Sequence, residues 1–146
     1  MKNLLSIKKL YSKNFKYNEE YKKVIWGSKN SMVNRHKLFF SILKKKEYQN
    51  WLDIGSGTGA IFDLQEKKKI KIKKKTGIEL NKNLYGYIKK RKLKNLTLIN
   101  KDIMYYKTLE KFDLISAIGI LQNSGYSYKK VLVKLIYLMQ KKSFLF

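Results

Sequence analysis

The chain of 146 residues lacks cysteine and proline altogether, and it contains a single histidine, His36. Without cysteine, disulfide scaffolds and thiolate metal sites are excluded. One histidine excludes a multi-histidine metal centre, so we expect no metal site. No apolar run approaches the roughly 20 residues that a membrane-spanning helix needs. The lysine-containing N-terminus has no apolar stretch long enough for a signal peptide. We therefore expect a cytoplasmic protein without a membrane partner.

Acidic residues are scarce, because only ten of them face 34 basic residues and the net charge is +24. A charge of this size is typical of proteins that bind a polyanion such as RNA. Nearly all the basic residues are lysine, however, and only Arg35 and Arg91 are arginine. Arginine is the residue that makes planar, bidentate contacts to phosphate and guanine. Drift toward lysine in a compositionally biased genome is therefore the favoured interpretation, and an RNA partner stays open as the other.

The length is enough for one compact domain and too short for two. In residues 1–47 the pattern indicates a helical segment, with a helix that begins after Ser28 or Ser31. Apolar residues recur there at spacings of three and four, as on one face of a helix. That face consists of Met32, His36, Phe39, Phe40 and Leu43. We expect His36 to face the core or its rim.

From residue 48 onward, short apolar runs alternate with helical patterns. The expected strands are Trp51–Ile54, Thr76–Leu80, Leu96–Asn100, Phe112–Ile118 and a fifth beginning in Ser143–Phe146, and the expected helices are Gly59–Glu66, Lys82–Leu93 and Tyr128–Gln140. The lysine runs Lys67–Lys69 and Lys73–Lys75 are expected to form a solvated loop and the entry to the second strand. This alternation predicts an α/β fold, a Rossmann-like doubly wound parallel sheet over residues 48–146. Such sheets bind ligands at the carboxyl ends of their strands.

Three glycines follow the first expected strand in the segment WLDIGSGTGA. Gly55, Gly57 and Gly59 permit a tight turn and let a ligand approach the backbone closely. By spacing alone, Gly55, Gly57 and Ala60 also satisfy the dinucleotide fingerprint, whose third position accepts alanine. Asp53 favours a different ligand, because its carboxylate is a poor neighbour for a pyrophosphate. The same carboxylate would attract the positive sulfonium and amino groups of S-adenosylmethionine.

The segment Asp53–Gly59, DIGSGTG, resembles the first motif of the class I S-adenosylmethionine-dependent methyltransferases, and further matches follow in that family's order. Glu79, in TGIELN, resembles the acid that accepts hydrogen bonds from both ribose hydroxyls. Asp102, in INKDIM, is similar to the acid that meets the adenine amino group, with Ile103 against the ring. As an alternative, Asp102 caps the turn that follows it. The segment 112–122, FDLISAIGILQ, resembles the fourth-strand motif that lines the methyl-transfer site.

The resemblance covers about residues 48–146, and the stretch WGSKNSMVNRH before it is only loosely similar to lead-in segments of some members. It implies S-adenosylmethionine as cofactor and a methyl acceptor that stays unidentified. The implied cofactor-binding residues are Asp53, Gly55, Ser56, Gly57, Gly59, Glu79, Leu80, Asp102, Ile103 and Ile118. No catalytic residue is identified, because methyl transfer from a sulfonium mainly needs proximity and alignment. Asp113 is expected to be structural.

The family's domain continues well beyond a fifth strand, whereas this chain ends at Phe146. We therefore expect a C-terminally truncated domain that lacks its terminal strands. The open sheet edge would be apolar and would call for a partner or an oligomer to cover it. Two other functions stay open. One is a non-catalytic basic nucleic-acid-binding module or a degenerate methyltransferase remnant, and the less favoured one is an NAD-binding Rossmann protein.

Overall fold

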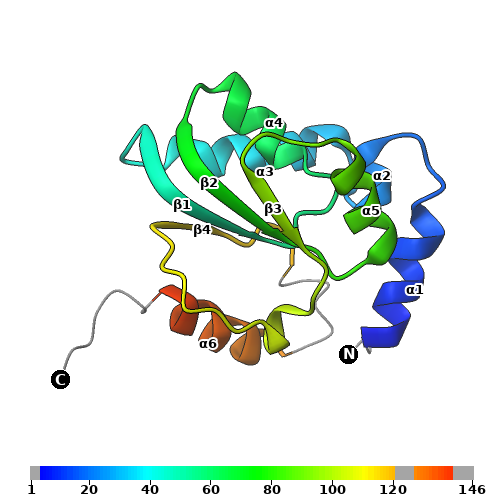
Figure 1. Cartoon of the computed structure of the whole chain (residues 1–146). Helices are drawn as coiled ribbons and strands as arrows, with labels where there is room; N and C mark the ends of the chain where they lie inside the picture. The colour runs from blue at the N-terminus through cyan, green and yellow to red at the C-terminus, as the bar shows by residue number, and fades with distance from the viewer. Residues whose placement is uncertain (1–3, 121–126, 140–146) are drawn as a thin grey trace.

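The computed structural model describes residues 4–120 and 127–139, and four parallel strands form one sheet in the order β3-β2-β1-β4 (Figure 1). The strands are β1 (Glu47–Ile54), β2 (Lys71–Ile78), β3 (Leu96–Ile99) and β4 (Leu114–Ser116). The helices are α1 (Leu4–Asn14), α2 (Glu20–Lys23), α3 (Lys29–Ser41), α4 (Ala60–Lys67), α5 (Lys82–Lys90) and α6 (Tyr128–Met139), with a 3-10 turn, η1 (Ile103–Tyr105). None of these helices is long and apolar enough to cross a membrane.

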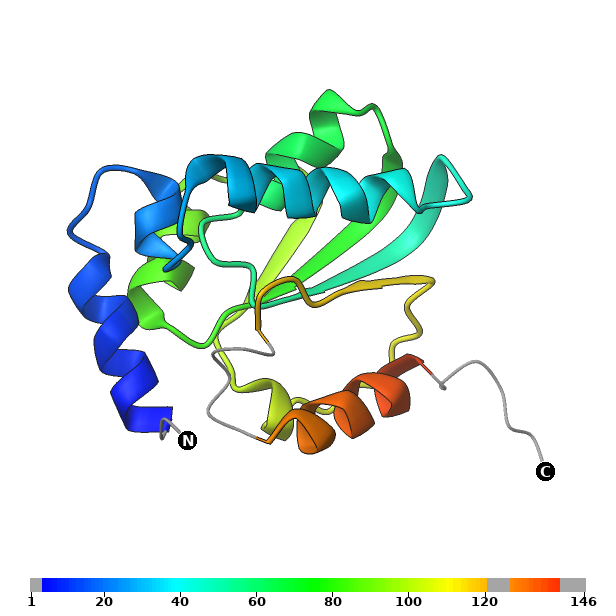
Figure 2. The same cartoon turned by 180° about the vertical axis from the view of Figure 1, so that it is seen from behind.

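Helices cover both faces of the sheet. Successive side chains of β1 point to opposite faces, so neighbouring residues of this strand pack in different cores. Trp51 packs in one core with Phe40 of α3 and Phe62 of α4. Leu52, the next residue, packs in the other core with Leu138 of α6. The two opposite views show α3 and α4 on one side of the sheet, and α6 with η1 on the other (Figures 1 and 2). The prediction of a doubly wound parallel sheet with a helical lead-in is confirmed.

The strand order reverses at β1. From β1 the chain moves to β2 and β3 on one side, and it then returns to β4 on the other side of β1. In doubly wound sheets such a reversal opens a crevice outside the carboxyl ends of the strands, where ligands bind. The fold thus places a binding site at the ends of β1 and β4, next to the turn that follows β1.

The second strand begins earlier than the sequence pattern suggested. It starts at Lys71, and Ile72 is buried between the exposed Lys71 and Lys73, which is the period-two pattern of a strand. Lys75 lies inside the strand and is only 3% exposed. Its Nζ donates to Gln65 Oε1 over 3.2 Å. The expectation that this lysine run is solvated is wrong for Lys75, because α4 covers that face of the sheet.

The ends of other elements also differ by a few residues. α5 ends at Lys90 instead of Leu93, because Lys92 and Asn95 adopt positive φ angles of 48° and 56° that no helix continues. β4 covers only the middle of the expected fourth strand. At the start of α3, Ser28 is the cap, since its side chain accepts a hydrogen bond from the Ser31 backbone N–H. The expected fifth strand lies outside the described residues.

Asp113 has the structural role expected for it. Its carboxylate accepts hydrogen bonds from the backbone N–H groups of Gln49, at 2.9 Å, and Asn50, at 2.8 Å. The Asp113 backbone N–H donates in return to the Asn50 carbonyl over 3.1 Å. This side chain therefore joins the amino end of β1 to the segment that enters β4.

Replacing Asp113 with alanine should lower the free energy of unfolding by about 1–2 kcal/mol, because two hydrogen bonds to a charged acceptor are lost at a solvent-exposed position. Glu110→Ala is the matched control. Its ion pair with Lys74 is partly exposed on both sides, and such pairs contribute roughly 0–1 kcal/mol. Urea unfolding of both variants measures the difference. Equal effects of the two substitutions would contradict the role assigned to Asp113.

Candidate functional site

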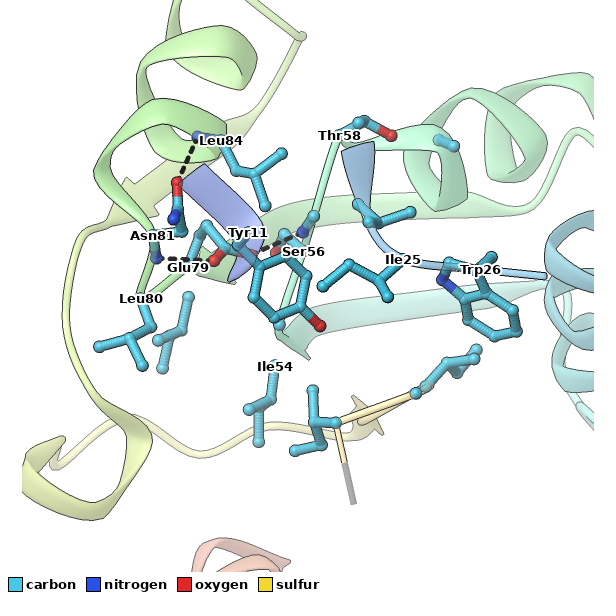
Figure 3. A pocket seen from close by; sticks show the side chains of 18 of the residues that line it. Tyr11, Ile25, Trp26, Ile54, Ser56, Thr58, Glu79, Leu80, Asn81 and Leu84 are labelled. Carbon is cyan, nitrogen blue, oxygen red and sulfur yellow. Dashed lines mark hydrogen bonds between the residues drawn. The ribbon is translucent and has the colours of Figure 1, made fainter. Parts of the chain in front are cut away.

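A cavity of about 220 Å³ lies at the carboxyl ends of the strands. Its walls come from the ends of β1, β2 and β4 and from the N-terminal helical segment. Figure 3 shows Glu79 and Asn81 at one end of the cavity and Trp26 at the other, with Tyr11 and Ile25 between them. Residues from both parts of the chain thus enclose one space.

The turn after β1 requires glycine for two reasons. Gly55, Gly57 and Gly59 have φ angles of 76°, 59° and 82°, a region that side chains rarely permit. Neighbouring side chains also leave no room for a Cβ atom at two of these glycines. A Cβ on Gly55 would overlap Ile120, and one on Gly57 would lie 2.8 Å from Val24 Cγ1. The turn therefore brings main-chain atoms to the cavity wall.

Glu79, directly after β2, binds this turn. Its Oε2 accepts from the Gly57 backbone N–H over 2.8 Å, and its Oε1 accepts from the Asn81 backbone N–H over 2.8 Å. Asn81 Oδ1 then caps α5 by accepting from the N–H groups of Asn83 and Leu84. A carboxylate oxygen has two lone pairs, so the Glu79 carboxylate retains capacity to accept from a ligand hydroxyl.

Two acids carry unusual pKa values beside the turn. The pKa of Glu79, which is 7% exposed, is raised to about 7, mainly by burial and to a smaller extent by the charge of Asp53, while the backbone hydrogen bonds act in the opposite direction. Burial also raises the pKa of Asp53, to about 6. Asp53 accepts a hydrogen bond from Ser116 Oγ over 2.5 Å, and Ser116 Oγ accepts one from Trp51 Nε1 over 2.8 Å. Asp53 is thus held inside the sheet.

Most of the residues predicted for the cofactor do line the cavity. They are Gly55, Ser56, Gly57, Glu79, Leu80, Asp102, Ile103 and Ile118. Asp53 and Gly59 are not among its lining residues. The carboxylate that lines the cavity next to the glycine turn is therefore that of Glu79. Asp102 Oδ1 accepts from the Met104 backbone N–H over 2.9 Å and caps η1, which is the local role weighed for it.

The sequence did not predict the contribution of the N-terminal segment to the cavity. Tyr11, Val24, Trp26, Arg35 and His36 all line it. The Arg35 guanidinium lies 4.8 Å from the centre of the Trp26 ring, and the His36 ring meets the same indole edge-on at 6.2 Å. Burial lowers the pKa of His36 to about 4, so the imidazole is neutral at pH 7. The only signal in the sequence was the loose similarity of the stretch from Trp26 to His36.

Thr58 carries a buried hydroxyl, Oγ1, for which the described part of the chain offers no hydrogen-bond partner. The residue lies in the glycine turn, lines the cavity and is 2% exposed. A buried polar group without a partner costs about 1–3 kcal/mol.

No protein-family model and no curated protein matches the chain. Solved structures match it by fold. The N-methyltransferase NodS from Bradyrhizobium japonicum WM9, in complex with S-adenosyl-L-homocysteine, aligns with a TM-score of 0.74 and 16% identity over 91% of this chain and 67% of NodS. Phosphoethanolamine N-methyltransferase 1 from Haemonchus contortus, in complex with phosphoethanolamine and S-adenosylhomocysteine, aligns with a TM-score of 0.69 and 14% identity. The chain has the class I methyltransferase fold.

The methyltransferase fold does not by itself determine the reaction. The [4+2]-cyclase SpnF also aligns, with a TM-score of 0.60 and 18% identity over 73% of this chain and 40% of the cyclase. The alignment with NodS covers 67% of NodS. The alignment with the Haemonchus enzyme covers 90% of this chain but only 28% of that enzyme. Function must therefore be argued from the residues of the cavity.

The raised pKa of Glu79 predicts a pH-dependent stability. Because the folded-state pKa of about 7 exceeds the usual value of 4.5 for a glutamate, the contribution of this group is fully present below pH 4.5 and is lost as the pH rises through 7. Glu79→Gln should therefore gain stability relative to the unmodified protein between pH 5 and pH 8, by on the order of 1–3 kcal/mol. Urea unfolding at both pH values measures this gain. A pH-independent difference between Glu79→Gln and the unmodified protein would contradict the raised pKa.

Proposed function

We propose that this chain binds S-adenosylmethionine in the cavity and transfers its methyl group to an acceptor that is not identified. The observation that carries the proposal is the hydrogen bond between the Glu79 carboxylate and the Gly57 backbone N–H at the cavity wall. It brings an acid at the end of β2 to the glycine turn at the end of β1. The similarity in fold to methyltransferases that bind S-adenosylhomocysteine supports the same ligand.

The residues of the cavity fit the parts of this ligand. We assign Glu79 to the ribose hydroxyls, because its oxygens retain lone pairs. We assign Asp102 to the adenine amino group. Ile103, which is largely buried, would pack against the adenine ring. Asp53 and Gly59 would support the turn from behind instead of contacting the ligand, while Gly55, Ser56, Leu80 and Ile118 complete the wall.

The cofactor supplies a methyl group already activated by its sulfonium, so the protein's task is to align an acceptor with it and to exclude water. Ile118, Gly119 and Ile120 lie at the carboxyl end of β4, and Trp26 packs directly on Gly119. We propose that this apolar wall surrounds the transferred methyl group. No described residue is assigned as a general base.

We further propose that residues 48–146 form a partial methyltransferase core and that residues 1–47 close the cavity over the ligand. The cytoplasmic location and the covering of the sheet edge by a partner or a second copy stay predictions from the sequence. The comparisons add no support for an NAD-binding protein.

Calorimetry with S-adenosylhomocysteine tests the function. We expect the unmodified protein to bind, and Glu79→Ala to weaken binding at least about tenfold, since hydrogen bonds to a charged acceptor contribute roughly 1.5–3 kcal/mol. Glu110→Ala, outside the cavity, should bind like the unmodified protein. Folded protein that produces no heat at millimolar ligand would refute the proposal. Unchanged affinity in Glu79→Ala would refute only the ribose assignment.

As a second candidate function, we propose that RNA binds lysines at the edge of the sheet opposite the cavity. Lys44–Lys46, Lys67–Lys69, Lys92 and Lys94 are exposed and precede β1, β2 and β3. They therefore lie at the amino ends of the strands, on the edge opposite the cavity. Lysines at this edge could contact the phosphate backbone of RNA, and such contacts do not distinguish one nucleotide sequence from another. RNA held there would be a partner distant from the methyl-transfer site.

Binding of labelled single-stranded RNA at several salt concentrations tests this surface. Changing Lys67, Lys68 and Lys69 to glutamate should weaken binding and reduce its salt dependence, because fewer counterions are released. S-adenosylhomocysteine binding should stay unchanged in that variant. The matched control changes Lys8, Lys9 and Lys13 of α1. If both triple variants lose affinity equally, the attraction is a diffuse effect of net charge and the surface is not an RNA site.

A further inference from the structure

Arg91 is the centre of a polar network that lies behind the glycine turn. It follows α5 directly, and its side chain is 23% exposed. Its Nη1 donates to the Thr58 carbonyl over 2.8 Å, and its Nη2 donates to Asp63 Oδ1 over 2.5 Å. Thr58 belongs to the glycine turn and Asp63 to the first turn of α4. One guanidinium therefore ties both to the end of α5.

The same side chain extends toward α2. Arg91 Nη1 lies 4.0 Å from Glu20 Oε1. Tyr87, one turn earlier in α5, donates from its hydroxyl to the same oxygen over 3.3 Å. The residues that follow α2, Val24–Gly27, form part of the cavity wall. Two wall segments that are far apart in the sequence thus share one anchor.

Close packing makes the turn sensitive to this anchor. A Cβ on Gly59 would lie 3.2 Å from Arg91 Nη1, so the guanidinium rests against the backbone of the turn. The side chain of Val24, after α2, packs against Gly57 of the same turn. The turn is therefore packed against Arg91 at Gly59 and against the segment after α2 at Gly57.

We propose that Arg91 is a positioning residue for the cavity, which holds the glycine turn and the segment after α2 in the arrangement that binds the ligand. This inference rests on the proposed function. The role requires arginine, because a planar guanidinium donates to two acceptors in fixed directions, whereas the ammonium of lysine is a single flexible point. That requirement explains an arginine at this position in a chain with only two of them among its 34 basic residues.

The experiment compares Arg91→Lys with Lys90→Ala, an exposed neighbour on α5, and Glu20→Gln with Glu19→Gln. Calorimetry gives the affinity for S-adenosylhomocysteine, thermal unfolding gives Tm, and hydrogen exchange of the unliganded protein reports on residues 57–60 and 24–27. We expect Arg91→Lys to weaken binding about tenfold and to speed exchange in both segments together. Its Tm should change little, because partly exposed ion pairs contribute little to stability. Glu20→Gln should speed exchange mainly in residues 24–27, and neither control should change affinity or exchange.

Two results would overturn the inference. One is an affinity in Arg91→Lys equal to that of the unmodified protein, which together with a lower Tm would indicate a purely structural role. The other is faster exchange in only one segment. If the unmodified protein itself does not bind S-adenosylhomocysteine, the proposed function fails separately. Hydrogen exchange then still tests the role of Arg91. Faster exchange of both segments in Arg91→Lys supports that role, and unchanged exchange refutes it.

Discussion

The hydrogen bonds of the buried Glu79 carboxylate join the two strand ends on which the site is built. One oxygen accepts from Gly57 in the turn after β1, and the other accepts from Asn81 at the start of α5. Removing this acid from water is costly, as its pKa of about 7 indicates, and the two backbone N–H groups offset part of that cost. This one side chain thus contacts both the glycine turn and the residue that caps α5, at the wall of the cavity.

Acidic and basic side chains lie in different parts of the described structure. The interior near the turn contains two acids with raised pKa values, Asp53 and Glu79, while many of the exposed lysines lie at the opposite edge of the sheet. A ligand with a positive sulfonium and amino group would stabilise the ionised form of a carboxylate that is poorly solvated. The large net charge of the chain therefore does not conflict with a site for a positively charged ligand.

Much of the fold was predictable, because glycines and alternating apolar runs are local signals. The turn at Gly55–Gly59 and Glu79 at the end of a strand followed from sequence alone. The early start of β2 could have been found from the alternation of Lys71, Ile72 and Lys73. The hydrogen bond to Asp53 could not, because its donor, Ser116, belongs to a strand that lies far away in the sequence. The same holds for Trp26 and Arg35, which reach the cavity only through the packing of the N-terminal helices.

A titration of ¹⁵N-labelled protein with S-adenosylhomocysteine measures whether the glycine turn and Glu79 bind the cofactor. If they do, the amide signals of residues 55–58 and 79–81 shift on binding, while those of Lys67–Lys69 at the opposite edge stay in place. A spectrum that does not change, or changes confined to that opposite edge, would contradict this binding.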